Sequence, residues 1–301
     1  MRYAPFFVFR QIVFLWEKGE KMLELEKDNL PKILPPKNDI VFKMLFGDDR
    51  NVNILMEFLE AVLEKKINEV QILNPINKQN RKDDKLSILD VKAKANLENG
   101  EIIDIEMQAR NVPELRSRIS YYSTKMLVDQ IGNGGDYTDI KPVISIIIVG
   151  ETLIRESDKC HNIFLMLEKC EKFPFNDLQE IHILDLSRIE KEENETLSDW
   201  LTFINSEREE DFMRVAVKNK AINTAFGELK ILSADKKQRA RYDDRLKLQR
   251  DIRSFENAAR QQGMQQGMQQ GGDEIFNLLE KGYSIEEAKK IFYSNKQRIN
   301  A

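Results

Sequence analysis

The sequence predicts an α/β protein in which helices flank a mixed β-sheet and a helical extension follows at the C-terminus. Three observations support this class. Short stretches rich in Val and Ile alternate with segments whose apolar residues recur every three or four positions. The stretch 143–149 is apolar and β-branched almost throughout, as expected of a central strand covered on both faces. After residue 190, long charge runs typical of solvated helices replace the strand patterns.

Composition narrows the class further. The chain has 301 residues, 41% of them hydrophobic and 33% charged, which excludes collagen-like and wholly disordered proteins. The chain has two cysteines, Cys160 and Cys170, which are too few for a disulfide framework and favour a cytoplasmic location. Together with His161 they also lack the spacing of a zinc site. The chain has only two histidines, His161 and His182, so a catalytic metal would need carboxylate ligands. A net charge of −4 means that a nucleic-acid surface must be local.

Residues 1–31 are expected to form an N-terminal arm. We expect no functional residue before position 22. The apolar segment 4–16 is interrupted by Arg10 and is too short to span a membrane, so no membrane partner is expected. Two interpretations stay open. The segment is an amphipathic helix or arm, or translation begins at Met22 after codons for 18–21 that resemble a ribosome-binding site. N-terminal mass determination distinguishes them.

The next elements are two helices. Pro35 and Pro36 impose an extended approach, after which Asn38 or Asp39 caps a short helix that ends at Gly47. A second helix begins at Asp49 or Asn51. Its apolar residues lie on a single face; they are Ile54, Leu55, Phe58, Leu59, Val62 and Leu63.

Strands follow at 69–73, 85–97 and 101–109, the last two joined as a hairpin around Asn99-Gly100. A helix then runs from Pro113 to about residue 131, and further strands occupy 143–149 and 181–186. Together these elements define a domain over residues 32–233.

The turn decides the register of the hairpin. A two-residue turn pairs Glu98 with Glu101, whereas a three-residue loop pairs Leu97 with Glu101. We expect the three-residue loop, because Gly100 suits its left-handed position. Lys92 then lies opposite Glu106, and Asp90 becomes a same-face diagonal neighbour of Glu106.

Residues 234–301 divide into two segments. Residues 234–272 contain a basic stretch, 235–260, which is a solvated helical face or a nucleic-acid contact. The Gly/Gln/Met repeat at 261–271 follows; it is a flexible linker or a helix supported by a partner, because three glycines cost about 3 kcal/mol in an isolated helix. Residues 273–301 read as two small helices, and Ser284 with Glu287 forms a capping box for the second.

Acidic residues within apolar strands are the candidate metal-binding and catalytic residues. Glu106 and Gln108 are two positions apart and project from one face of their strand. In the expected register Asp90 joins them, and two carboxylates with backbone carbonyls and water suit Mg²⁺ or Mn²⁺. The alternative is that these are surface acids on a half-exposed hairpin.

A resemblance to a known family favours the metal site. It is carried by Asn38-Asp39-Ile40-Val41-Phe42-Lys43-Met44-Leu45-Phe46-Gly47, Ile88-Leu89-Asp90-Val91-Lys92-Ala93, Ile105-Glu106-Met107-Gln108 and Arg118-Ile119-Ser120-Tyr121-Tyr122. In order and spacing these motifs resemble the Rpn (recombination-promoting nuclease) family, also described as PD-(D/E)XK nuclease family transposases. The resemblance covers residues 32–270.

What the resemblance implies is a restriction-endonuclease-like core and metal-dependent cleavage of DNA. Matched residue by residue, Asp39 is the acid on the first helix, Asp90 and Glu106 bind the metal, and Gln108 completes the E-x-Q pair. Arg118 and Tyr122 match the helix behind the site. Gln108 stands where the wider superfamily has lysine and cannot supply positive charge; we infer from the strand face that Lys92 or Lys94 compensates.

The expected function is therefore a divalent-metal-dependent DNA endonuclease, linked to recombination or mobile DNA. The alternative is a catalytically weak or inactive nuclease fold that acts in DNA binding or assembly. A third hypothesis makes the tail the working part. The expected partners are DNA and further copies of the chain, joined through the C-terminal region.

Overall fold

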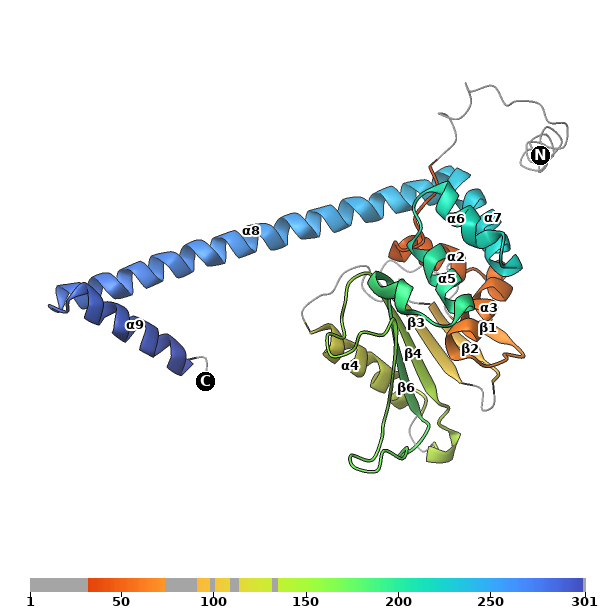
Figure 1. The fold of residues 1–301 in the computed structure, drawn as a ribbon, viewed down its shortest axis with the longest axis horizontal. Helices are drawn as coiled ribbons and strands as arrows, with labels where there is room; N and C mark the ends of the chain where they lie inside the picture. Colours follow the sequence, from red (N-terminus) through yellow and green to blue (C-terminus); the bar gives the residue numbers. More distant parts are fainter. Residues whose placement is uncertain (1–31, 74–90, 98–100, 109–113, 132–134, 300–301) are drawn as a thin grey trace, which may run out of the picture. The chain divides into compact units, whose positions relative to one another are not determined.

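The computed structural model describes residues 32–73, 91–97, 101–108, 114–131 and 135–299, and the chain divides into two compact units at residues 242 and 243. The first unit contains a six-stranded sheet in the order β1-β2-β3-β4-β6-β5 (Figure 1). The strands are β1 (Val70–Ile72), β2 (Val91–Ala95), β3 (Ile102–Gln108), β4 (Val143–Val149), β5 (His161–Leu165) and β6 (Gln179–Asp185). β3, β4 and β6 run parallel and the remaining neighbours antiparallel, so the predicted mixed α/β fold is confirmed.

Helices cover the two faces of the sheet unequally. The larger core joins the sheet to α2 (Asp39–Phe46), α3 (Val52–Leu63), α5 (Glu195–Asn205), α6 (Glu209–Ala216) and α7 (Lys220–Ala234). On the other face α4 (Leu115–Val128) packs Leu115 and Ile119 against Ile147, Val149 and Ile183 (Figure 1). Short 3-10 helices lie at Asp49–Asn51, Tyr137–Asp139 and Leu186–Lys191.

The first helix follows the sequence prediction closely. Asn38 caps α2 through its side chain, which accepts a hydrogen bond from the Ile40 backbone N–H. Gly47 is the C-cap, and its N–H donates to the Lys43 carbonyl. The predicted apolar face of α3 is buried at Ile54, Leu55, Phe58, Leu59 and Val62, and β4 is buried at every position.

The predicted hairpin register is wrong by two residues. Lys92 lies opposite Asp104 and Val91 opposite Ile105, so Lys92 is not opposite Glu106. Ala95 donates its N–H to the Glu101 carbonyl, which leaves residues 96–100 in the connection instead of a three-residue loop. The Glu101 side chain also accepts from the Leu97 N–H. Residues 98–100, which include the predicted turn, lie outside the described residues.

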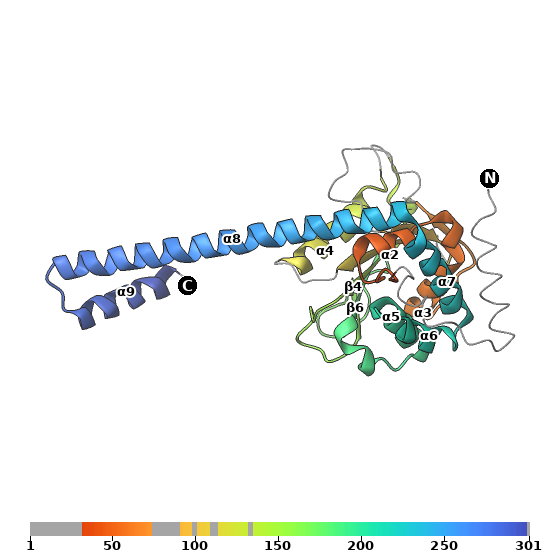
Figure 2. The same cartoon turned by 90° about the horizontal axis from the view of Figure 1, so that it is seen from above.

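The second unit consists of helices alone. α8 (Lys236–Glu280) begins in the first unit and runs continuously through the Gly/Gln/Met repeat, so the repeat is helical and the first of the two small helices predicted after residue 273 is the end of α8. Gly282 turns the chain with φ of 87°, and the predicted Ser284–Glu287 capping box opens α9 (Ile285–Ile299). α9 runs back along the end of α8 (Figure 2), with Phe292 against Gly271. Among the described helices, none has the length and apolar character needed to cross a membrane.

Candidate active site

Strand β3 separates polar from apolar side chains by simple alternation. Ile103, Ile105 and Met107 point into the larger core. Asp104, Glu106 and Gln108 therefore lie on the opposite face, the one that α4 covers in part. Alternation gives three polar groups in a row, of which Asp104 is the most buried, at 7% exposure.

Neighbouring strands complete this face. In the β2–β3 register Lys92 lies opposite Asp104, which makes it a diagonal neighbour of Glu106. Lys94 lies opposite Ile102 and is exposed. On β4, Ser145 lies beside Asp104 and is buried, and its hydroxyl has no hydrogen-bond partner among the described residues. Neighbouring strands thus place acidic, basic and amide groups on the same face.

Helix α4 adds a cation to Glu106. A guanidinium nitrogen (Nη2) of Arg118 lies 3.9 Å from Glu106 Oε1, and the two side chains are 46% and 26% exposed. An ion pair of this length and exposure contributes less than about 1 kcal/mol to the free energy of folding, so Arg118 lies near the carboxylate but is bound to it only weakly. The guanidinium can therefore turn toward a bound anion at little cost.

Tyr122 lies one helical turn beyond Arg118. Tyr121 and Tyr122 are both exposed, and their rings meet edge to face with centroids 5.3 Å apart. Neither ring is part of either apolar core, and both side chains are in part open to solvent.

Asp39 belongs to a different layer. It is the first residue of α2, is 8% exposed, and accepts a hydrogen bond at Oδ1 from the Ile40 N–H over 2.8 Å. α2 belongs to the helix layer of the larger core, and Asp39 stands at its N-terminal end. On the Glu106 face the structure brings Arg118 to Glu106, with Gln108 on the same face and Lys92 diagonal to Glu106.

Asp90, the second predicted metal ligand, lies outside the described residues. The β2–β3 pairs end at Val91 opposite Ile105, so no described residue of β2 lies opposite Glu106. Within the described ranges no group of three or more His, Cys, Asp or Glu residues is arranged to hold a metal ion. The donors that are described, a part-exposed carboxylate and an amide oxygen on one face, are hard oxygen ligands of the kind that Mg²⁺ and Mn²⁺ prefer.

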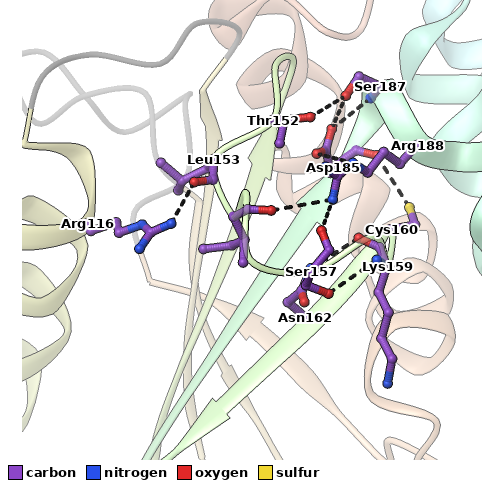
Figure 3. A network of polar contacts seen from close by, with 11 residues as sticks. Arg116, Thr152, Leu153, Ser157, Lys159, Cys160, Asn162, Asp185, Ser187 and Arg188 are labelled. Carbon is purple, nitrogen blue, oxygen red and sulfur yellow. Dashed lines mark hydrogen bonds and ion pairs between the residues drawn. The ribbon is translucent and has the colours of Figure 1, made fainter.

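A polar network fixes the loop that leaves β4 beside this site (Figure 3). Gly150 donates its N–H to the Gln108 carbonyl, and Asp185 lies in the same row of the sheet as Gln108. The Arg188 guanidinium bonds the carbonyls of Ser157 and Ile154 and lies 3.7 Å from Asp185 Oδ2.

From the α4 side, Arg116 bonds the Leu153 carbonyl and the Glu156 carboxylate (Figure 3 shows the first contact). This hydrogen bond from Arg116 lowers the pKa of Glu156 to about 2. The loop over residues 151–159 is thus held by arginines on both sides, at the end of the sheet where Gln108 stands.

Sequence reasoning did not single out Asp104, Arg116 or Arg188. Asp104 could have been found, because Asp104-x-Glu106-x-Gln108 places it on the Glu106 face by alternation alone. The two arginines carry no such signal, since the hydrogen bonds that hold the 151–159 loop join them to residues more than thirty positions away in the chain.

Comparison with known proteins identifies the family of the chain. The family described as PD-(D/E)XK nuclease family transposase matches residues 36–259, and the chain belongs to that family. The match spans the sheet, all the helices around it and the first part of α8. No curated protein and no solved structure gives a significant match to the chain.

Proposed function

We propose that the protein is a divalent-metal-dependent endonuclease that hydrolyses phosphodiester bonds in DNA, with a role in recombination or in mobile DNA. One observation carries the proposal. In a chain of a nuclease family, β3 presents Glu106 and Gln108 on one face, and Arg118 approaches that carboxylate to 3.9 Å. An acid, an amide and a mobile cation on one surface suit a phosphodiester substrate.

In this proposal Asp90 and Glu106 hold Mg²⁺ or Mn²⁺. The ion, when bound, activates water and neutralises charge on the phosphate. Glu106 is held in place by β3, whose neighbours on both sides fix the strand, and its partial exposure leaves the carboxylate open to solvent. Asp39 assists the site or orients water, and Gln108 holds water or a phosphate oxygen through its amide.

Positive charge comes from residues other than Gln108. Arg118 turns from Glu106 to a phosphate oxygen, where its planar guanidinium can bond two oxygens at once. Lys92, diagonal to Glu106, adds a second cation from β2. Tyr122 lies exposed one turn beyond Arg118 and packs beside the nucleic acid.

We also propose that the chain assembles through its C-terminal region. In α8 the apolar residues Leu248, Ile252 and Phe255 are 46–76% exposed and follow the four- and three-residue spacing of a helix interface. Ile252→Lys should then lower the mass of the full chain in light scattering, and an unchanged mass would remove the proposal. We place the protein in the cytoplasm, because Cys160 and Cys170 are both free thiols.

Cleavage of supercoiled plasmid in Mg²⁺ tests the main proposal. Asp90→Asn and Glu106→Gln keep side-chain size and remove charge, so each should lower the rate at least a hundredfold. Glu57→Gln, an exposed position on α3, makes the same change away from the site and should cleave like wild type. If the wild type and both site variants behave alike in Mg²⁺ and Mn²⁺, the chain is a nuclease fold without the activity, and its work is binding or assembly.

A further inference from the structure

The outer edge of the sheet is longer than β5 alone. β5 pairs with β6 over His161–Leu165, and the chain then pairs with residues 173–175 through an antiparallel bridge between Leu167 and Pro174. Phe175 donates its N–H to the Met166 carbonyl over 2.9 Å, and Glu168 donates to the Phe173 carbonyl over 2.8 Å. Residues 161–168 thus form one edge strand, whose inner side is occupied first by β6 and then by residues 173–175.

Hydrogen-bond alternation shows which backbone groups face outward. Asp185 donates its N–H to the Cys160 carbonyl, which makes residues 160 and 185 a hydrogen-bonded pair in the β5–β6 register. Even-numbered residues of the edge therefore point toward β6. The N–H and C=O groups of His161, Ile163, Leu165 and Leu167 point away, and within the described part of the chain no backbone hydrogen bond beyond the sheet reaches them.

The side chains of this edge are apolar and open to solvent. Seven are between 41% and 74% exposed: Ile163, Phe164, Leu165, Met166, Leu167, Phe173 and Phe175. Residues 161–167 contain no proline and no acidic or basic residue except His161. Burial, and then the neighbouring His182, lowers the pKa of His161 to about 4, so this histidine is neutral at physiological pH.

Soluble proteins usually protect an exposed edge with charge, proline or shortness. The opposite edge of this sheet follows that rule, because β1 has only three residues. The β5 edge has none of these protections over seven positions. Such an edge calls for a strand that covers it.

We propose that this edge pairs with the same edge of a second copy of the chain, antiparallel about a two-fold axis at Phe164. Only a two-fold axis at Phe164 brings all four outward-pointing residues into hydrogen-bonded pairs. Ile163 pairs with the partner's Leu165, and His161 pairs with the partner's Leu167. Phe164 then faces the partner's Phe164 in a close pair without hydrogen bonds. The two sheets become one continuous sheet.

The apolar side chains of the edge supply about half the area that a standard interface buries. The five on the edge strand itself, residues 163–167, offer about 80 Å² each, or about 400 Å², against about 800 Å² per partner. The edge backbone and its four hydrogen-bonded pairs supply the remainder. A second copy fits better than an unrelated strand, because Ile163 and Leu165 then meet apolar residues of the partner and the neutral His161 meets its Leu167.

One consequence rests on the proposed nuclease function. Residues in one row share a face, and the row through Glu106 runs by Ile147 and Ile183 to Asn162, two residues from the axis. Both copies of Glu106 then lie on the same side of the joined sheet.

Disulfide cross-linking through one introduced cysteine tests the pairing without reference to activity; the native Cys160 stays in place because it is buried. In a full-length Cys170→Ser background, Phe164→Cys should form a disulfide dimer under mild oxidation, because directly opposed residues have Cα atoms about 4.5 Å apart. Ile163→Cys is the matched control. It faces position 165 and lies more than about 7 Å from its own copy, so it should cross-link at least fivefold less. Equal cross-linking of the two, or none with Phe164→Cys, overturns the proposal.

Light scattering of the full chain gives a second measurement that does not need oxidation. Leu165→Lys should halve the mass, because it places like charges along the joined edge. Ile231→Lys, on α7 at 60% exposure, makes a similar change elsewhere and should leave the mass as in wild type. An unchanged mass for Leu165→Lys overturns the pairing, whereas loss of plasmid cleavage in the Glu106 variant bears only on the proposed function.

Discussion

Replacing Gly47 by alanine tests how closely the end of α2 is packed. Gly47 has φ of −97°, which any residue adopts, so an alanine with free space there would stabilise the fold by about 0.4–1 kcal/mol. Space is lacking. A Cβ on Gly47 would lie 2.6 Å from the Lys43 carbonyl oxygen and 3.4 Å from Lys43 Cδ. Lys43 is fully buried, so its side chain has no free direction in which to move.

Relieving this overlap requires a backbone shift at the end of α2, which costs about 1–3 kcal/mol. We therefore expect Gly47→Ala to lower the melting temperature of the full chain by about 2–12 °C, at roughly 2–4 °C per kcal/mol. Gly227→Ala is the matched control: it lies within α7 with nothing within 4 Å of its Cβ, and should raise the melting temperature by about 1–4 °C. A Gly47→Ala protein as stable as wild type would refute the packing described for α2.

Two further predictions concern the β5–β6 end of the sheet. His161 has a pKa of about 4 in the fold against 6.5 when unfolded, chiefly because it is buried. Since the unfolded chain takes up the proton first, the free energy of unfolding should fall by up to about 3 kcal/mol as pH drops from 6.5 to 4. His161→Gln should flatten that part of the urea-denaturation profile, and an unchanged slope would contradict the assignment. Arg188→Ala removes the bonds to Ser157 and Ile154 and should speed proteolysis within 151–159 about tenfold. Arg155→Ala, an exposed neighbour, should leave that rate unchanged.

Local patterns were sufficient for most elements of the first unit. The capping residue Asn38 and the glycine at position 47 mark both ends of α2, because a side-chain acceptor and a residue without Cβ are needed at those two points. The all-apolar stretch of β4 predicted a strand covered on both faces, and all seven of its residues are buried. In each case the information lies within a few residues of the element.

The register of the β2–β3 hairpin and the pairing of β5 could not be predicted from local sequence patterns. The hairpin register depends on a connection of five residues, 96–100, in which Glu101 caps the Leu97 N–H, and the Asn-Gly signal alone predicted a shorter loop. β5 was missed because it has no turn signal before it. Its position is set by contacts across the sheet, including a 2.7 Å hydrogen bond between His161 and His182.

In the candidate site, too, local spacing predicted some features and tertiary packing determines the others. The spacing of Glu106 and Gln108 predicted that both project from one face, and β3 places them there. Arg118 reaches Glu106 only because α4 packs over β4 and β6, a tertiary contact that no spacing in the sequence encodes. The helix continuing through 261–271 likewise gains support from α9, whose Phe292 fills the space beside Gly271.

The central claim is that Asp90 and Glu106 converge on one ion, and a double-mutant cycle of Mn²⁺ affinity tests it most directly. Calorimetric titration of the wild type, Asp90→Asn, Glu106→Gln and the double variant requires no substrate. Two ligands of one ion should each account for most of the affinity, so the double variant should bind hardly more weakly than either single variant. Losses that add independently, or Mn²⁺ affinity that survives in either single variant, would contradict the account.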